Sequence, residues 1–249
     1  MLQLQSRDRQ VLRFLEDNRA ITTSQATNIF FDGCKRSATR RLNQLEDAAI
    51  LTSYTRGKNK VYRLIDEVKE LSEHDLLIYN FYSWIYENNG EVLDFKKNPH
   101  YFKNALIPDA LVKFRLPYEG QTYTCYVLLE IDLNHYTEAD KIMTLYPKLY
   151  REQVLKEYCG AAEFPFIVIA RPTKGIIVRP RDIEVIYSDL KFNNLDRLLF
   201  SWEAGQSALL TTFVISAALH NTIIFGFSNR ITKPLKNTTL SYLKKWVST

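Results

Sequence analysis

The stretch KRSATRRLNQLEDAAILTSYTRGKNKVYRL, residues 35–64, decides how the first part of the chain is expected to fold. Ala38, Leu42 and Leu45 recur at the spacing of one helix face, so the first half of the stretch predicts an amphipathic helix. The second half predicts two strands around a glycine-containing turn, with the basic run RGKNK at the tip. A helix with a basic outer face followed by a basic hairpin is the order found where a wing flanks a DNA-reading helix.

Two shorter helical patterns precede this stretch. Residues 6–18 carry apolar side chains at helical spacing after Ser6, which is the expected N-cap. A second helix is expected to begin at Thr22 or Thr23, either of which can cap it. Two helices, a basic third helix and a basic hairpin together predict a winged helix-turn-helix domain over residues 1–66.

The charge of the chain is concentrated in this predicted domain. The formal net charge is +5. Residues 1–66 contain 12 Lys and Arg against 7 Asp and Glu, whereas residues 67–249 contain 21 of each kind. A local basic excess suggests an anionic partner, most often nucleic acid, and here we expect double-stranded DNA. The alternative is a solvated basic face on a winged helix that binds protein.

Side-chain chemistry divides the expected DNA contacts by role. Arg36, Arg40 and Asn43 can reach base edges or phosphates in a major groove, while their neighbours position the helix. The hairpin tip is expected to neutralise phosphates or to enter the minor groove. The residues expected to contact DNA are Lys35, Arg36, Ser37, Thr39, Arg40, Arg41, Asn43, Gln44, Arg56, Lys58, Asn59 and Lys60. Asp47 lies near the same outer face, which indicates that only the first two turns of the helix approach DNA.

Residues 67–249 are expected to form a second, α/β domain with a mixed sheet. Its first part, 67–100, is a connector region with an aromatic-rich helix ending at Gly90. The patterns that follow predict a strand hairpin over 105–117 and 122–135, a helix over 136–160 begun by Thr137 and kinked or restarted at Pro147, strands over 166–170 and 175–180, and a helix over 189–202. Residues 190–249 are treated as a C-terminal extension of helical and strand character.

The compartment follows from the cysteines and the apolar stretches. Three widely spaced cysteines without a CxxC pair fit a reduced cytosolic location, and the polar N-terminus does not resemble a secretory signal. Residues 208–227 have the length of a membrane span, but His220 and Asn221 interrupt them, so we expect no membrane association.

The stretch YVLLEIDLNH, residues 126–135, carries the candidate chemistry of the second domain. Glu130 and Asp132 are two residues apart in an expected strand and therefore share a face, and Asp109 begins the neighbouring strand. Metal-dependent phosphodiester cleavage needs two carboxylates for Mg²⁺ and a cation for the developing negative charge. Asp109 and Glu130 are the expected metal ligands, and the full candidate catalytic set is Asp109, Glu130, Asp132, Lys141 and Lys148.

The order of these phrases resembles the plasmid replication-relaxation protein family, over about residues 5–190. The matching phrases are Pro108, Asp109 and Ala110, then Glu130 and Asp132, then Lys148 and Tyr150. The resemblance implies a restriction-endonuclease-like fold for the second domain, in which an Asp on one strand and a Glu-x-Lys on the next hold a divalent metal. In this chain Asp132 stands where that pattern has Lys, so Lys141 or Lys148 would have to supply the cation.

The resemblance implies a DNA-binding protein of a plasmid, phage or integrative element, acting in replication initiation or control or in conjugative transfer. Its partners would be duplex DNA, replication or transfer proteins and a second copy of the chain, and its location the cytoplasm, on the nucleoid or plasmid. The second domain is expected to be non-catalytic and to need no cofactor. Two alternatives remain: an Mg²⁺-dependent DNA endonuclease targeted by the winged helix, and a transcriptional regulator that responds to a small ligand or peptide.

Overall fold

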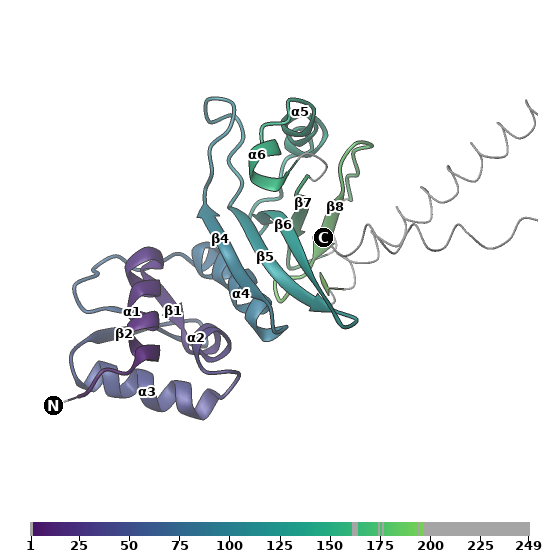
Figure 1. The fold of residues 1–249 in the computed structure, drawn as a ribbon. Helices are drawn as coiled ribbons and strands as arrows, with labels where there is room; N and C mark the ends of the chain where they lie inside the picture. Colours follow the sequence, from purple (N-terminus) through teal and green to yellow (C-terminus); the bar gives the residue numbers. More distant parts are fainter. Residues whose placement is uncertain (1, 161–163, 174, 176, 194, 197–249) are drawn as a thin grey trace, which may run out of the picture. The chain divides into compact units, whose positions relative to one another are not determined.

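The fold is that of a computed structural model, which describes residues 2–160, 164–173, 175, 177–193 and 195–196. These residues belong to one compact unit, Met1–Leu199 (Figure 1). The described chain is a mixed α/β structure with a three-stranded and a five-stranded sheet. No helix of the described residues is long and apolar enough to cross a membrane, and residues 208–227 lie outside the described part.

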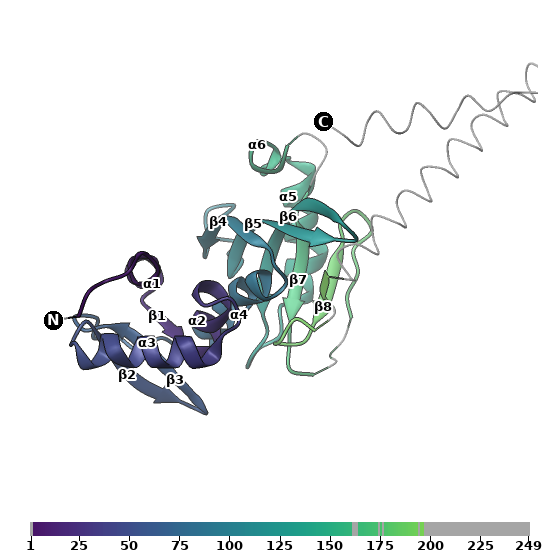
Figure 2. The same ribbon diagram turned by 60° about the horizontal axis from the view of Figure 1, so that its bottom comes forward.

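The first part of the chain combines three helices with a small antiparallel sheet in the order β1-β3-β2. A two-residue turn at Gly57 and Lys58 joins β2 to β3, and Gly57 has a φ of 58°, a left-handed conformation that glycine adopts without strain. Figure 2 shows α3 beside β2 and β3. The elements are α1 (Ser6–Asn18), β1 (Ala20–Thr22), α2 (Thr23–Phe30), α3 (Lys35–Asp47), β2 (Leu51–Arg56) and β3 (Asn59–Leu64).

Local sequence explains where these helices begin and which faces they bury. Thr22 caps α2 as expected, because its side chain accepts the backbone N–H of Gln25. Ala38, Leu42 and Leu45, the predicted inner face of α3, are fully buried, which confirms the helical spacing. The expected cap of the first helix is wrong by one residue, because Ser6 is already helical and Gln5 is the N-cap.

Helix α4 (Glu73–Glu87) belongs to the packing of both parts of the described chain. Its residues Leu76 and Tyr79 lie in the same apolar core as α1, α2 and α3. Another face of the helix contacts the larger sheet, where the rings of Phe81 and Phe114 lie 5.8 Å apart. Helix α4 therefore packs against both cores and connects them. The domain boundary after residue 66 stays a prediction.

The larger sheet has the order β4-β5-β6-β7-β8 and is mixed, as expected. Its first three strands are antiparallel, and β7 and β8 continue it in parallel. Leu111 and Leu128 are register partners that face the helix after β6, whereas Phe114 faces α4, so the sheet is covered on both sides. The strands are β4 (Glu91–Lys97), β5 (Ala110–Tyr118), β6 (Gln121–Ile131), β7 (Phe166–Ala170) and β8 (Val185–Ser188).

Two strand predictions need correction. The expected strand over 175–180 is not formed in its described residues; instead the backbone of Val178 donates to and accepts from the hydroxyl of Tyr187. The parallel strand at this edge is β8, and neither β8 nor β4 was predicted. The helix expected over 189–202 does not begin as predicted, because residues 189–193 form a turn; only Leu195 and Asp196 of the remainder are described.

The helix after β6 changes from π-helical to α-helical just before the expected proline. It runs as a π-helical segment, η1 (Lys141–Leu145), followed by α5 (Tyr146–Arg151) and the short α6 (Lys156–Cys159). Pro147 lies in the first turn of α5, where its missing N–H is tolerated. Thr137 is not the N-cap acceptor that was predicted, because its N–H and hydroxyl both donate to the carboxylate of Asp132.

Candidate functional site

The outer face of α3 presents three basic side chains that no other described residue contacts by an ion pair or hydrogen bond. They are Lys35, Arg36 and Arg40, all exposed. Arg36 and Arg40 are one helical turn apart and lie opposite the buried face of the helix. At the tip of the β2–β3 hairpin, Lys58 is likewise exposed and without a partner among the described residues.

Other cations of the predicted DNA-contact set are paired with carboxylates of the protein. Arg41 donates through Nε and Nη2 to the carboxylate of Asp8, at 2.8 and 2.5 Å, and so ties α3 to α1. Lys60 lies 2.6 Å from Glu46, and the hydrogen bond between them raises the pKa of Lys60. Arg56 lies 3.7 Å from the Glu70 carboxylate.

The polar side chains of the set divide in the same way. The Asn43 amide oxygen accepts hydrogen bonds from Lys60 and Tyr62, so it stabilises the contact between α3 and β3. The Gln44 amide oxygen accepts from Arg41 at 3.0 Å. Asn59 is exposed at the hairpin tip, whereas Ser37 and Thr39 are partly buried. The C-terminal half of α3 is thus engaged within the protein, and its N-terminal half and the hairpin tip carry the free charges.

A second candidate site lies where β5 begins and β6 ends. A cleft of about 370 Å³ is lined by all three predicted acids, Asp109, Glu130 and Asp132, and by Lys141. Asp109 accepts the backbone N–H of Ile131 at 2.7 Å, which fixes its carboxylate across the two strands. The structure therefore brings four of the five predicted catalytic residues together.

Lys148, the other lysine expected to supply the cation, does not line this cleft. The π-helical segment η1 begins at Lys141 and adds a residue to the helical turn, which rotates the positions that follow. Lys148 is instead paired at 3.8 Å with Glu152 and lies over the ring of Phe102.

Glu130 is almost fully buried, with 5% of its surface exposed. Its Oε1 atom lies 2.6 Å from Lys141 Nζ and also accepts a hydrogen bond from the hydroxyl of Tyr146. Burial raises the pKa of Glu130 to about 7, against the opposing effect of Lys141. Tyr146 was not predicted for this site; its position on the helix facing Glu130 depends on the packing of α5 on the sheet.

Asp132 makes a different set of contacts from those of Glu130. One carboxylate oxygen accepts from the N–H and hydroxyl of Thr137, at 2.8 and 2.6 Å. The other lies 3.2 Å from Arg171 Nη2, and both side chains of this pair are buried. Asp132 therefore anchors the start of the following helix to β7, and sequence reasoning missed Arg171 because its pairing is decided by the parallel β6–β7 alignment.

His74, at the start of α4, also reaches this cleft and was not predicted for it. Its Nε2 atom lies 3.2 Å from Asp109, and that hydrogen bond raises the pKa of His74. The expected metal ligands, Asp109 and Glu130, are not arranged to bind a metal. The carboxylate of Asp109 already contacts His74, and that of Glu130 already contacts Lys141. Within the described part of the chain, no group of three or more His, Cys, Asp or Glu side chains is placed to hold a metal.

The sequence matches no protein-family model, and the search of curated proteins gives no match. The indications of a function therefore lie in the fold, in the basic face of α3 with the hairpin tip, and in the cleft at Asp109 and Glu130.

Proposed function

We propose that residues 6–64 form a winged helix-turn-helix that binds duplex DNA through the N-terminal half of α3 and the tip of the β2–β3 hairpin. The observation that carries this proposal is that some basic side chains of these elements are paired with carboxylates and others are not. Arg41, Arg56 and Lys60 are paired with carboxylates, whereas Lys35, Arg36, Arg40 and Lys58 face solvent without a partner among the described residues. Unpaired basic side chains on a helix and an adjoining hairpin are the groups that phosphates and base edges require.

The second part of the proposal concerns the role of the whole chain. The resemblance of the Pro108–Ala110 and Glu130–Asp132 phrases to the plasmid replication-relaxation family supports a role in replication or transfer of a mobile element. The nuclease-like domain is proposed to be structural, since Asp132 binds Thr137 and Arg171 and so serves the fold. DNA binding is the part of this proposal that the geometry supports best.

Replacing Arg40 by alanine is expected to lower DNA affinity by roughly 5- to 150-fold, because one direct contact is typically worth about 1–3 kcal/mol. The measurement is fluorescence anisotropy on duplexes tiled across the DNA flanking the gene. Four phosphate contacts would give a slope of log K against log salt of about −4, and Arg40→Ala should make it shallower by about one if Arg40 contacts a phosphate.

Arg181→Ala is the matched control, since Arg181 is an exposed arginine beyond the predicted winged helix with no partner among the described residues. Its affinity and salt slope should equal those of the unmodified protein. Equal affinities for Arg40→Ala and Arg181→Ala would rule out the proposed interface.

A specific observation also favours a second candidate function, a metal-dependent DNA endonuclease. Lys141 Nζ lies 2.6 Å from Glu130 and 3.0 Å from the carbonyl oxygen of Ile107, so a cation lies beside Glu130 although Asp132 stands in place of the lysine of the nuclease pattern. This candidate requires Lys141 to move away from Glu130 before a metal could bind. It predicts nicking of supercoiled DNA in Mg²⁺ or Mn²⁺ that is lost in Glu130→Gln and Lys141→Ala and retained in Lys148→Ala. Intact supercoiled DNA with the unmodified protein would contradict it.

A further inference from the structure

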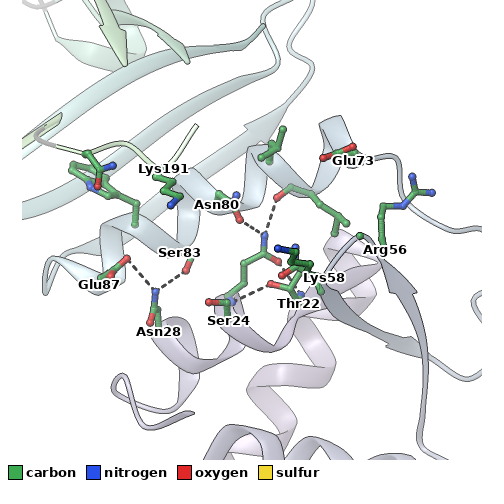
Figure 3. Close-up of a pocket in the computed structure, with 17 residues that line it drawn as sticks. Thr22, Ser24, Asn28, Arg56, Lys58, Glu73, Asn80, Ser83, Glu87 and Lys191 are labelled. Atoms are coloured by element: carbon green, nitrogen blue, oxygen red, sulfur yellow. Dashed lines mark hydrogen bonds between the residues drawn. The ribbon is translucent and has the colours of Figure 1, made fainter. Parts of the chain in front are cut away.

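A polar groove of about 550 Å³ lies between α2, α4, the hairpin tip and the turn after β8 (Figure 3). Buried Gln25 helps to fix its floor. The side-chain amide of Gln25 donates to the carbonyl of Leu76 and to the side chain of Asn80, both at 2.8 Å. Asn28 likewise donates to Ser83 at 3.1 Å. The groove is therefore formed by elements that are already locked together without a ligand.

Two lysines from separate segments line this groove. Lys58 comes from the hairpin tip and Lys191 from the turn after β8 (Figure 3). Both are exposed, and neither has an ion-pair or hydrogen-bond partner for its amine among the described residues. Two such amines at the border of one concave site are suited to hold a single anionic group.

The turn that carries Lys191 is firmly built. Phe192 is fully buried, with its ring 5.2 Å from that of Phe81 on α4, and it adopts a left-handed φ of 60°. The carboxylate of Asp189 accepts the backbone N–H groups of Lys191 and Asn193, at 2.9 and 3.1 Å. A buried anchor and an Asp-stabilised turn thus place Lys191 at the groove.

The carboxylates of the groove limit what it can accept. Glu73 and Glu87 also line it, and they would repel a continuous polyanion such as a DNA backbone. They are instead acceptors for hydroxyl or amino groups. Leu77 and Trp84 add apolar surface, and the volume lies within the range of roughly 300–1,000 Å³ typical of small-molecule sites.

We propose that this groove binds a nucleoside monophosphate. Its phosphate would bind on the border of the groove that Lys58 and Lys191 line, its sugar and base would donate to Glu73 or Glu87, and its base would lie against the apolar surface. A nucleoside monophosphate combines all three features in one ligand of suitable size. Lys58 also belongs to the DNA interface proposed above, so the nucleotide and DNA would compete for this side chain. This competition rests on the proposed function, whereas binding of the nucleotide does not.

The test is thermal unfolding of the full chain with the 5′-monophosphates of adenosine, guanosine, cytidine and uridine. At least one is expected to raise the Tm, by roughly 3 °C at ten times its Kd. The rise should be lost in Lys191→Ala and retained in Lys156→Ala, an exposed lysine on α6 without a partner among the described residues. The corresponding nucleoside without phosphate should give no rise.

Three results would overturn the proposal. They are the absence of any rise with all four nucleotides, equal rises in Lys191→Ala and Lys156→Ala, and an equal rise with inorganic phosphate alone. These measurements contain no DNA, so their failure is separate from a failure of DNA binding. In the anisotropy assay, the active nucleotide should weaken DNA binding by the unmodified protein and leave that of Lys191→Ala unchanged.

Discussion

Replacing Arg41 by alanine is expected to destabilise the protein by about 3 kcal/mol or more. Arg41 makes two hydrogen bonds to Asp8, whose surface is 1% exposed. Without the guanidinium, the buried carboxylate keeps the backbone N–H of Gln5 as its hydrogen-bond donor but loses its counter-charge. Urea denaturation followed by circular dichroism measures the loss as a lower midpoint with an unchanged slope.

Arg40→Ala is the matched control for this prediction, because the neighbouring side chain is exposed and has no partner among the described residues. It should change stability by no more than about 0.5 kcal/mol while it weakens DNA binding. A large stability loss in Arg40→Ala, or none in Arg41→Ala, would contradict the division of α3 into an exposed basic face, proposed to bind DNA, and an arginine that anchors the helix to α1.

The same ion pair sets a pH dependence. Burial alone would raise the pKa of Asp8, but the hydrogen bonds from Arg41 and from the backbone of Gln5 outweigh it, and the net pKa lies below its ordinary value. A carboxyl with a lowered folded-state pKa stabilises the fold above its unfolded pKa, and that contribution is lost as the pH falls below about 4. Arg41→Ala should reduce the steepness of acid unfolding in this range.

Arg171→Ala is expected to have an effect of similar size, about 3 kcal/mol or more, in the second part of the chain. The Nη2 atom of Arg171 lies 3.2 Å from the carboxylate of Asp132, and the two side chains are 6% and 3% exposed. The guanidinium also lies over the ring of Tyr187 at 4.5 Å, so the substitution removes packing as well as charge. The midpoint of urea unfolding is again the measurement.

Two variants test whether the uncompensated charge is the cause. Arg151→Ala removes an arginine whose pair with Asp182 is about half exposed, and it should cost at most about 1 kcal/mol. Adding Asp132→Asn to Arg171→Ala should recover part of the stability, because a neutral amide replaces the buried carboxylate. If the double variant were less stable than Arg171→Ala, the loss would have to come from packing alone.

The first part of the chain follows closely from its sequence. The spacing of Ala38, Leu42 and Leu45 predicted the buried face of α3, and RGKNK predicted a turn that the structure places at Gly57 and Lys58. These features depend on contacts within a few residues, where helical periodicity and turn chemistry act directly. The strands β4 and β8 were missed because they are edge strands that depend on pairing with distant partners.

The candidate sites show the same division. Alternation along β6 correctly placed Glu130 and Asp132 beside Asp109 at one cleft, since pleating is a local property. It could not show that His74, Tyr146 and Arg171 would reach these carboxylates, because each comes from another element of the fold. Lys141 and Lys148 were both expected to supply the cation, but the π-helical segment that begins at Lys141 changes the helical register before Lys148.

By itself the sequence determined the helical and strand periods, the basic character of α3 and the hairpin, and the shared face of the acids in β6. Only the tertiary structure decided which charges are free and which are neutralised. Arg40 and Arg41 are adjacent and chemically identical, yet one faces solvent and the other binds Asp8 across 33 residues. The reason is physical: charge is a property of the residue, whereas its partner and its burial depend on where the chain returns in space.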